Sequence, residues 1–320
     1  MNFIVNAILS MMVLLVAAMI GIAQYDPILF AARLHPYSQA YVNDLMKLKR
    51  QAAAKITERK LVVVSGSSGL HGIRCSILAD RLNLPCINGG LPIELGAPAI
   101  FGFDKSLIRP GDVTLLPLEF DFYFLPAYGG AGEGKAVAGD VGDLSRLQVK
   151  QFFRMDFNFF LSAFVENVVA LTGYRSFDVA VQFTPEGDRR LHTRELAKAF
   201  AQNRSRQTFE KQVFFAGYPI TSEMKEVLRE FFAWAKANNI TVIGTIQPIY
   251  DDWKLPQRWL TEIPALFGTA GYGFTIPPGY AQYPRDCFWD SWDHLNEECQ
   301  LAHTQILADT LATEFPEIFK

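Results

Sequence analysis

Two short segments near opposite ends of the chain contain side chains that could act together as a nucleophile, a base and a carboxylate. The first, residues 62–73, contains Ser67, and the second contains Asp290, Asp293 and His294. A serine hydroxyl becomes a useful nucleophile when a base accepts its proton and a third group orients that base. The two segments therefore predict Ser67 as nucleophile, His294 as base and one of the two aspartates as the orienting carboxylate.

Each of these residues also has an ordinary structural interpretation. A Gly-Ser-Ser sequence in a loop is common in turns, and His294 could be a surface residue beside a helix terminus. His71 follows Ser67 by four residues and is a rival base. We expect it to lie inside the next helix and to point along that helix's side, so His294 is the preferred base.

The elements around both segments would hold these residues in place. Leu61–Val64 is predicted as a buried strand that breaks at small residues and continues as one helix. The apolar positions of that helix are Leu70, Ile73, Ile77, Leu78 and Leu82. Near the other end of the chain, Asn296 can cap a helix with acidic residues in its first turn, which holds the preceding histidine loop.

The remaining pattern alternates strands with helices and predicts an α/β fold. Strands are expected at 84–88, 113–120 and 240–246, with helices between them and a final helix after Asn296. Successive strand-helix units form a parallel sheet with active groups at the carboxyl edge of its strands. We expect one α/β domain over 61–320, with an insertion at about 128–212.

The chain begins with a long apolar segment. Residues 1–25 carry no charged side chain, and about 20 apolar residues suffice for a transmembrane helix. An uncleaved signal anchor is the preferred interpretation, and a signal peptide cleaved near Gly21–Ala23 is the alternative. Charge alone does not orient the span, because no Lys or Arg precedes it and Arg33 lies shortly after it.

Residues 26–60 are predicted to form a helical stem between the anchor and the α/β domain. One face of this helix is expected to carry the apolar side chains of Tyr41, Leu45, Leu48 and Ala52. The charged side chains of Lys47, Lys49 and Arg50 would lie elsewhere on the helix.

Composition and motifs disfavour other classes of function. The net charge is −3 and no basic stripe interleaved with aromatic residues occurs, so we do not expect a nucleic-acid partner. No metal-binding, phosphate-loop or dinucleotide motif is present, so no cofactor and no metal are expected. His35, His192 and His303 have no partner pattern.

The four cysteines leave two interpretations open. In an exported domain Cys75 could pair with Cys86 and Cys287 with Cys299. Four separate buried thiols are equally compatible with the sequence. The phenylalanine-rich residues 152–164 are also ambiguous, because they could pack in a core, line an acyl or partner groove, or lie on a membrane surface.

Residues 65–73, Ser-Gly-Ser-Ser-Gly-Leu-His-Gly-Ile, resemble the nucleophile block of the SGNH (GDSL-like) hydrolase superfamily, and residues 288–296 resemble its closing block. The resemblance covers about 60–315. It implies a three-layer α/β/α, flavodoxin-like fold with Ser67 as nucleophile and His294 as base. Asp290 fits the longer of the family's Asp-to-His spacings, whereas Asp293 is adjacent to the histidine and less able to reach its ring.

The resemblance also implies an oxyanion hole formed by the amides of Ser67 and Gly90, with Gly89 and Gly96 as alternatives to Gly90. Many members carry Asn after the third strand, where this chain has Glu119. An ionised carboxylate accepts hydrogen bonds and would repel a developing oxyanion. The hole would then rely on the Ser67 amide with a glycine amide, or on a protonated Glu119.

The matching branch of the superfamily consists of membrane-anchored, exported proteins linked to the modification of cell-surface polymers. The resemblance thus implies a single-pass inner-membrane protein with a periplasmic serine esterase or O-acyltransferase domain. Its substrates would be an acyl donor, such as one used in acetylation, and an exopolysaccharide or other envelope polymer. A membrane-bound acyltransferase or polymer-export proteins would be its partners. The alternative is a catalytically inactive scaffold or binding subunit of a polysaccharide synthesis and export complex.

Overall fold

The computed structural model describes residues 36–124, 179–198 and 218–319. The predicted anchor at 1–25, the start of the stem, and most of the predicted insertion, including 152–164, lie outside these residues. Within the described part, no helix combines the length and apolar character needed to cross a bilayer.

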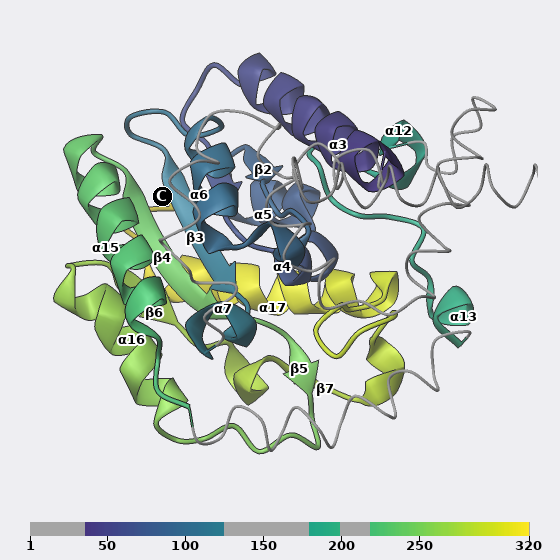
Figure 1. The fold of residues 1–320 in the computed structure, drawn as a ribbon. Coiled ribbons are helices and arrows are strands. Elements are labelled where there is room, and N and C mark those ends of the chain that lie inside the picture. Colours follow the sequence, from purple (N-terminus) through teal and green to yellow (C-terminus); the bar gives the residue numbers. More distant parts are fainter. Residues whose placement is uncertain (1–35, 125–178, 199–217, 320) are drawn as a thin grey trace, which may run out of the picture. The chain divides into compact units, whose positions relative to one another are not determined.

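A parallel five-stranded sheet forms the centre of the described domain (Figure 1). Its strands, in spatial order, are β2 (Cys86–Asn88), β1 (Leu61–Val63), β3 (Val113–Leu118), β4 (Thr241–Ile246) and β6 (Gly273–Thr275). All neighbouring pairs are parallel, which confirms the predicted α/β class. A second, two-stranded sheet pairs β5 (Ile249–Tyr250) with β7 (Gln282–Tyr283).

Ten α-helices are described around these sheets. They are α3 (Pro36–Lys55), α4 (Ser67–Gly72), α5 (Cys75–Leu82), α6 (Ala97–Lys105), α7 (Phe120–Phe124), α12 (Val179–Gln182), α13 (Arg194–Ala197), α15 (Ser222–Ala237), α16 (Trp259–Thr269) and α17 (Glu297–Glu314). Short 3₁₀ helices occupy Ile93–Leu95, Pro278–Ala281 and Arg285–Cys287.

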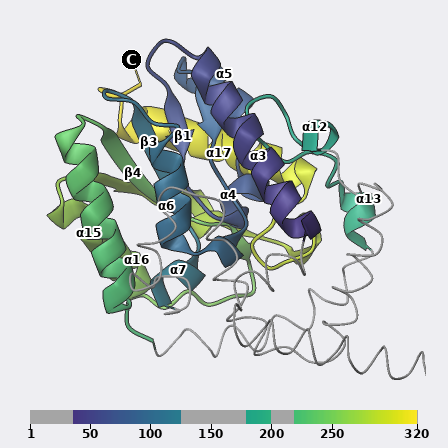
Figure 2. The same ribbon diagram turned by 45° about the horizontal axis from the view of Figure 1, so that its top comes forward.

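Helices cover both faces of the sheet (Figures 1 and 2). On one face, α5 and α17 pack their apolar side chains against β1 and β3, and Leu78, Leu307 and Leu311 are fully buried there. On the other, α6 and α15 lie over the sheet (Figure 2). Every residue of β1 and β3 is buried, as is typical of parallel strands enclosed on both faces.

Two local predictions need correction. The single helix expected after Ser67 is divided into α4 and α5, because Ile73 is extended (φ −115°, ψ 136°). At the break, the backbone N–H of Arg74 donates to Thr304 Oγ1 at 3.0 Å and that of Cys75 to Asp188 Oδ2 at 2.8 Å. These two side chains take the place of the backbone carbonyls that would accept the N–H groups in a continuous helix. The sequence around the break does not reveal them, because they are distant in the chain.

The buried face of α3 also differs from the prediction. Val42, Leu45 and Ala53 are buried, whereas Leu48 and Ala52 are only partly buried. Lys49, which was expected away from the apolar face, is completely buried. Its ammonium group donates to the carbonyls of Asn88 and Gly187, which compensates for the loss of water on burial.

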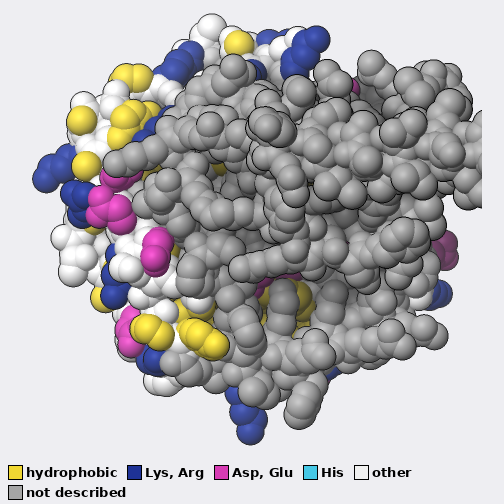
Figure 3. Space-filling model, in the orientation of Figure 1, with side chains coloured by type: hydrophobic (Ala, Val, Ile, Leu, Met, Phe, Trp, Pro, Cys, Tyr) yellow, Lys and Arg dark blue, Asp and Glu magenta, His cyan; other side chains and the backbone are white. Residues whose placement is uncertain are grey.

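Both cysteine pairings considered above are present as disulfides, Cys75–Cys86 and Cys287–Cys299. The first joins the start of α5 to β2, and the second joins the segment before the histidine loop to α17. On the described surface in view, basic and acidic side chains are interspersed (Figure 3). That part of the surface has no extended region of one charge.

Candidate active site

Ser67 is the first residue of α4, directly after the turn that follows β1. Ser65 Oγ holds this turn: it donates to the carbonyl of Pro117 on β3 at 2.9 Å and accepts the N–H of Gly69 at 3.0 Å. A β-carbon on Gly69 would lie 2.5 Å from that of Ser65, so the contact requires glycine. The turn thus fixes Ser67 at the carboxyl end of the sheet, with 9% of its surface exposed.

The histidine segment forms a closed loop in front of α17. Phe288 and Leu295 form an antiparallel bridge, and the N–H of Trp289 donates to the carbonyl of His294 at 2.7 Å. Asn296 caps α17 as predicted, since its Oδ1 accepts the N–H of Cys299 at 3.1 Å. The Cys287–Cys299 disulfide joins the residue directly before the loop to the same helix.

His294 and Asp290 form a close pair within this loop. His294 Nδ1 lies 2.6 Å from Asp290 Oδ1, and a carboxylate can only accept, so Nδ1–H donates. When His294 is neutral, this arrangement leaves Nε2 as the nitrogen that can accept a proton. Asp293 Oδ1 lies 3.9 Å from Nε2 and accepts a hydrogen bond from Ser291 Oγ. Asp290 therefore occupies the orienting position.

The surrounding carboxylates favour a charged His294. Burial disfavours the imidazolium, but Asp293, Asp290 and Glu119 outweigh this cost and raise the pKa of His294 to about 9. Burial opposes ionisation of Asp290, yet its hydrogen bond and attraction to His294 lower its pKa overall. At neutral pH this pair is an imidazolium-carboxylate pair.

The nucleophile helix and the histidine loop meet through a ring contact. His71 on α4 stacks on His294, with ring centroids 4.2 Å apart and planes within 10°. Since His71 is one helical turn from Ser67, this contact brings the predicted base to the predicted nucleophile's helix. No hydrogen bond between the Ser67 hydroxyl and His294 is present in the described structure.

The glycine amides considered for the oxyanion hole donate to other acceptors. The N–H of Gly90 donates to Asn88 Oδ1 at 2.9 Å, that of Gly89 to the carbonyl of Val63, and that of Gly96 to the carbonyl of Ile93. Gly90 nevertheless lies beside the Ser67 turn, because a β-carbon there would be 2.8 Å from the N of Leu70 and 2.9 Å from the O of Gly66.

Glu119 lies immediately after β3 and contacts the nucleophile turn directly. It is fully buried, and its two oxygens accept the N–H groups of Gly66 at 3.0 Å and Ser68 at 2.7 Å. A β-carbon on Gly66 would lie 2.4 Å from Glu119 Oε1, so only glycine allows this approach. Burial, together with the nearby Asp293, raises the pKa of Glu119 to about 7.

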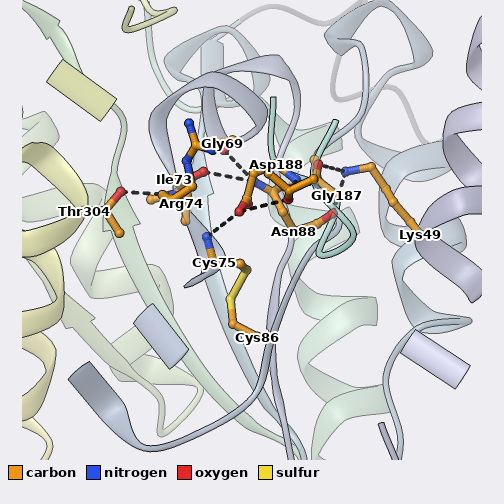
Figure 4. The surroundings of a disulfide bond; sticks show 12 residues. Lys49, Gly69, Ile73, Arg74, Cys75, Cys86, Asn88, Gly187, Asp188 and Thr304 are labelled. Carbon is orange, nitrogen blue, oxygen red and sulfur yellow. Dashed lines mark hydrogen bonds between the residues drawn. A yellow bond between two sulfur atoms is a disulfide. The ribbon is translucent and has the colours of Figure 1, made fainter. Parts of the chain in front are cut away.

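A buried polar network supports the far end of α4 (Figure 4). Asn88 Nδ2 donates to the carbonyls of Gly69 and Ile73 and to Asp188 Oδ1. Lys49 Nζ donates to the carbonyls of Asn88 at 2.5 Å and Gly187 at 3.0 Å. Four segments far apart in the sequence thus converge behind the nucleophile helix.

Sequence reasoning missed this network and one of the histidines near the site. The ring of His192 lies edge-on to His71, with centroids 5.2 Å apart, although its sequence neighbourhood shows no partner pattern. His192 and Asp188 lie at least 100 residues from their contacts on α4 and β2, and no local periodicity encodes such a contact. The described residues contain no group of His, Cys, Asp or Glu arranged to hold a metal ion.

Comparison with known proteins yields no match for this chain among protein-family models, curated proteins or solved structures.

Proposed function

We propose that this protein is a serine esterase or O-acyltransferase with Ser67 as nucleophile, His294 as base and Asp290 as the residue that orients the base. The observation that carries the proposal is the 2.6 Å hydrogen bond between Asp290 and His294, in a loop whose histidine stacks on the helix that begins at Ser67. This arrangement supplies the base-orienter half of a triad beside a serine at a strand's carboxyl end.

In the proposed reaction, His294 Nε2 accepts the Ser67 proton while Oγ attacks the carbonyl carbon of an acyl ester. The ester's alcohol leaves with the proton from His294, and Ser67 retains the acyl group. Water or a sugar hydroxyl then attacks the acyl-enzyme, His294 again transfers the proton, and free Ser67 is regenerated. Hydrolysis and transfer differ only in which hydroxyl reaches the acyl-enzyme.

The oxyanion that forms in each step needs hydrogen-bond donors. The Ser67 amide is one candidate, and Gly90 could contribute if its N–H exchanged Asn88 for the oxyanion. A protonated Glu119 is the other candidate, because its pKa of about 7 leaves part of the population neutral near pH 7.

The finer proposal follows the sequence resemblance: an SGNH-like three-layer domain, anchored by residues 1–25 in the inner membrane and acting in the periplasm on an envelope polysaccharide. The parallel sheet, the position of Ser67 after its first strand and the position of His294 before the last helix support it. Two disulfides support an oxidising compartment.

A catalytically inactive scaffold or binding subunit of a polymer export complex is the second candidate. Glu119 is the observation that favours it, because its carboxylate takes the N–H groups on either side of Ser67. The Gly90 amide is also engaged, so the described site has no assembled oxyanion hole.

A fluorophosphonate probe separates the two candidates. The protein is incubated with the probe and its intact mass is measured, beside Ser67→Ala, His294→Ala and the control Ser68→Ala, which removes the neighbouring buried hydroxyl. We expect one adduct on the wild type and on Ser68→Ala, and none on the other two variants. An unlabelled but folded wild type would overturn the enzyme proposal and favour the scaffold.

A further inference from the structure

The contact between His71 and His294 is an unusual feature of the candidate site. His71 comes from the fifth residue of α4, whereas His294 comes from the loop before α17. Their rings are nearly parallel, with centroids 4.2 Å apart. The His71 ring therefore covers one face of the His294 imidazole.

His71 makes this contact through its ring face. Its Nδ1 is buried and has no hydrogen-bond partner among the described residues. Burial, together with the neighbouring His294, His192 and Arg189, lowers the pKa of His71 well below its ordinary value. The ring is consequently neutral at physiological pH and presents a flat, uncharged surface to the charged His294.

His71 also contacts a third histidine. The rings of His71 and His192 are nearly perpendicular, with centroids 5.2 Å apart and an angle of 85° between them. The carbonyl of His192 accepts the N–H of Glu297 at 3.0 Å, which ties His192 to the first turn of α17. The three rings thus form a cluster between α4 and the helix that follows the histidine loop.

We propose that His71 is a positioning residue whose ring face restricts rotation of the His294 imidazole. With one face covered, the Nδ1–H of His294 stays on Asp290 and Nε2 stays available for the Ser67 proton. The effect on rate rests on the proposed function, whereas the effect on the orientation of His294 does not.

Two substitutions of similar size test the role of the ring face. His71→Phe keeps a planar ring and removes the imidazole nitrogens, whereas His71→Leu fills much of the same space without a planar face. The first measurement is the low-field proton resonance of His294 Nδ1–H, assigned by its absence in His294→Ala. The second is the rate of fluorophosphonate labelling of Ser67. Thermal unfolding of each variant is measured in parallel.

We expect His71→Phe to keep the resonance and to label within about threefold of the wild type. We expect His71→Leu to lose the resonance to exchange and to label at least about tenfold more slowly, because misplacement of about 1 Å costs up to 10²-fold. If His71→Leu retains both properties, or His71→Phe loses both, the stacking role is overturned. If His71→Leu fails to fold, the Phe result decides alone. If the resonance responds to the two substitutions as expected but the wild-type Ser67 is never labelled, the proposed function is refuted and the positioning role of His71 is retained.

Discussion

The protonation of His294 decides when the proposed base can work. A general base must be neutral, and with a pKa of about 9 only about 1% of His294 is neutral at pH 7. We therefore expect the labelling rate of Ser67 to rise about tenfold per unit between pH 6 and 8 and to level off near pH 9. Rates are measured from pH 5 to 10 and corrected for reagent hydrolysis.

The variant Asp293→Asn tests the cause of this profile. It removes a carboxylate whose charge raises the pKa of His294, so the rise should move to lower pH. A flat wild-type profile would contradict His294 as base. The same raised pKa stabilises the folded state fully below pH 6.5, and this stabilisation is lost as pH rises through 9.

Glu119 should affect the free energy of unfolding at lower pH than His294 does. Its folded-state pKa of about 7 lies above the ordinary 4.5, so the folded state loses stability relative to the unfolded chain as pH rises from 4.5 to 7. Glu119→Gln does not titrate. We expect the wild type to lose up to ~3 kcal/mol of unfolding free energy relative to this variant between pH 5 and 8.

Urea unfolding of both proteins at the two pH values measures this difference. Glu226→Gln is the control, because Glu226 is a partly exposed carboxylate on α15 that pairs with the exposed Arg229. Its difference from the wild type should change little with pH. An equally small change for Glu119→Gln would refute the raised pKa.

At the scale of elements, the two disulfides close loops of similar length, with sequence separations of 11 and 12. Loss of either should cost ~3 kcal/mol on chain-entropy grounds. The Cys287–Cys299 bond also anchors the loop that carries His294. We therefore expect the Cys287→Ser/Cys299→Ser double variant to label at least about tenfold more slowly, whereas Cys75→Ser/Cys86→Ser mainly loses stability.

Labelling rates and unfolding midpoints of the two double variants provide the comparison, at a temperature where both are folded. Equal labelling rates would show that the Cys287–Cys299 bond does not position the base. If the two double variants lose equal stability but label at different rates, the Cys287–Cys299 bond positions the base in addition to stabilising the fold.

Element patterns in the sequence predicted β1, β2, β3 and β4 of the central sheet, but they missed β6, the two strands of the second sheet, and several helix contacts. The buried apolar strand at Leu61 and the cap at Asn296 are local features, and both appear where expected. The break between α4 and α5 depends on Asp188 and Thr304, and the burial of Lys49 depends on carbonyls of Asn88 and Gly187. Those partners are distant in the chain, so no periodicity within one helix could reveal them.

In the candidate site too, local features could be predicted from the sequence and long-range contacts could not. The Asp290–His294 spacing and the serine turn could be read from short segments, and the hydrogen bond expected from the longer spacing is present. The approach of Glu119 to the amides around Ser67 could not be read from a short segment, since it depends on the register of β1 beside β3. The cluster of the His71, His192 and His294 rings likewise depends on tertiary packing.

For the molecule as a whole, the disulfides and the apolar N-terminal segment indicate the same location. Disulfides persist in oxidising compartments, and both bonds lie in the domain that follows the uncharged residues 1–25. Together they predict that the first segment crosses the membrane and that the domain folds on the outer side. The distribution of Lys and Arg around the apolar segment does not by itself predict this orientation.

The full chain, expressed in a bacterial host, should remain in the membrane pellet after an alkaline carbonate wash, because a helix that spans the bilayer is not removed by breaking electrostatic contacts. Protease added to spheroplasts should degrade the domain, and maleimide should label no cysteine of the denatured, unreduced protein. Release by carbonate with external exposure retained would identify a cleaved signal peptide. Protection from protease together with four reactive thiols would place the domain in the cytoplasm and contradict both the anchor's orientation and the periplasmic proposal.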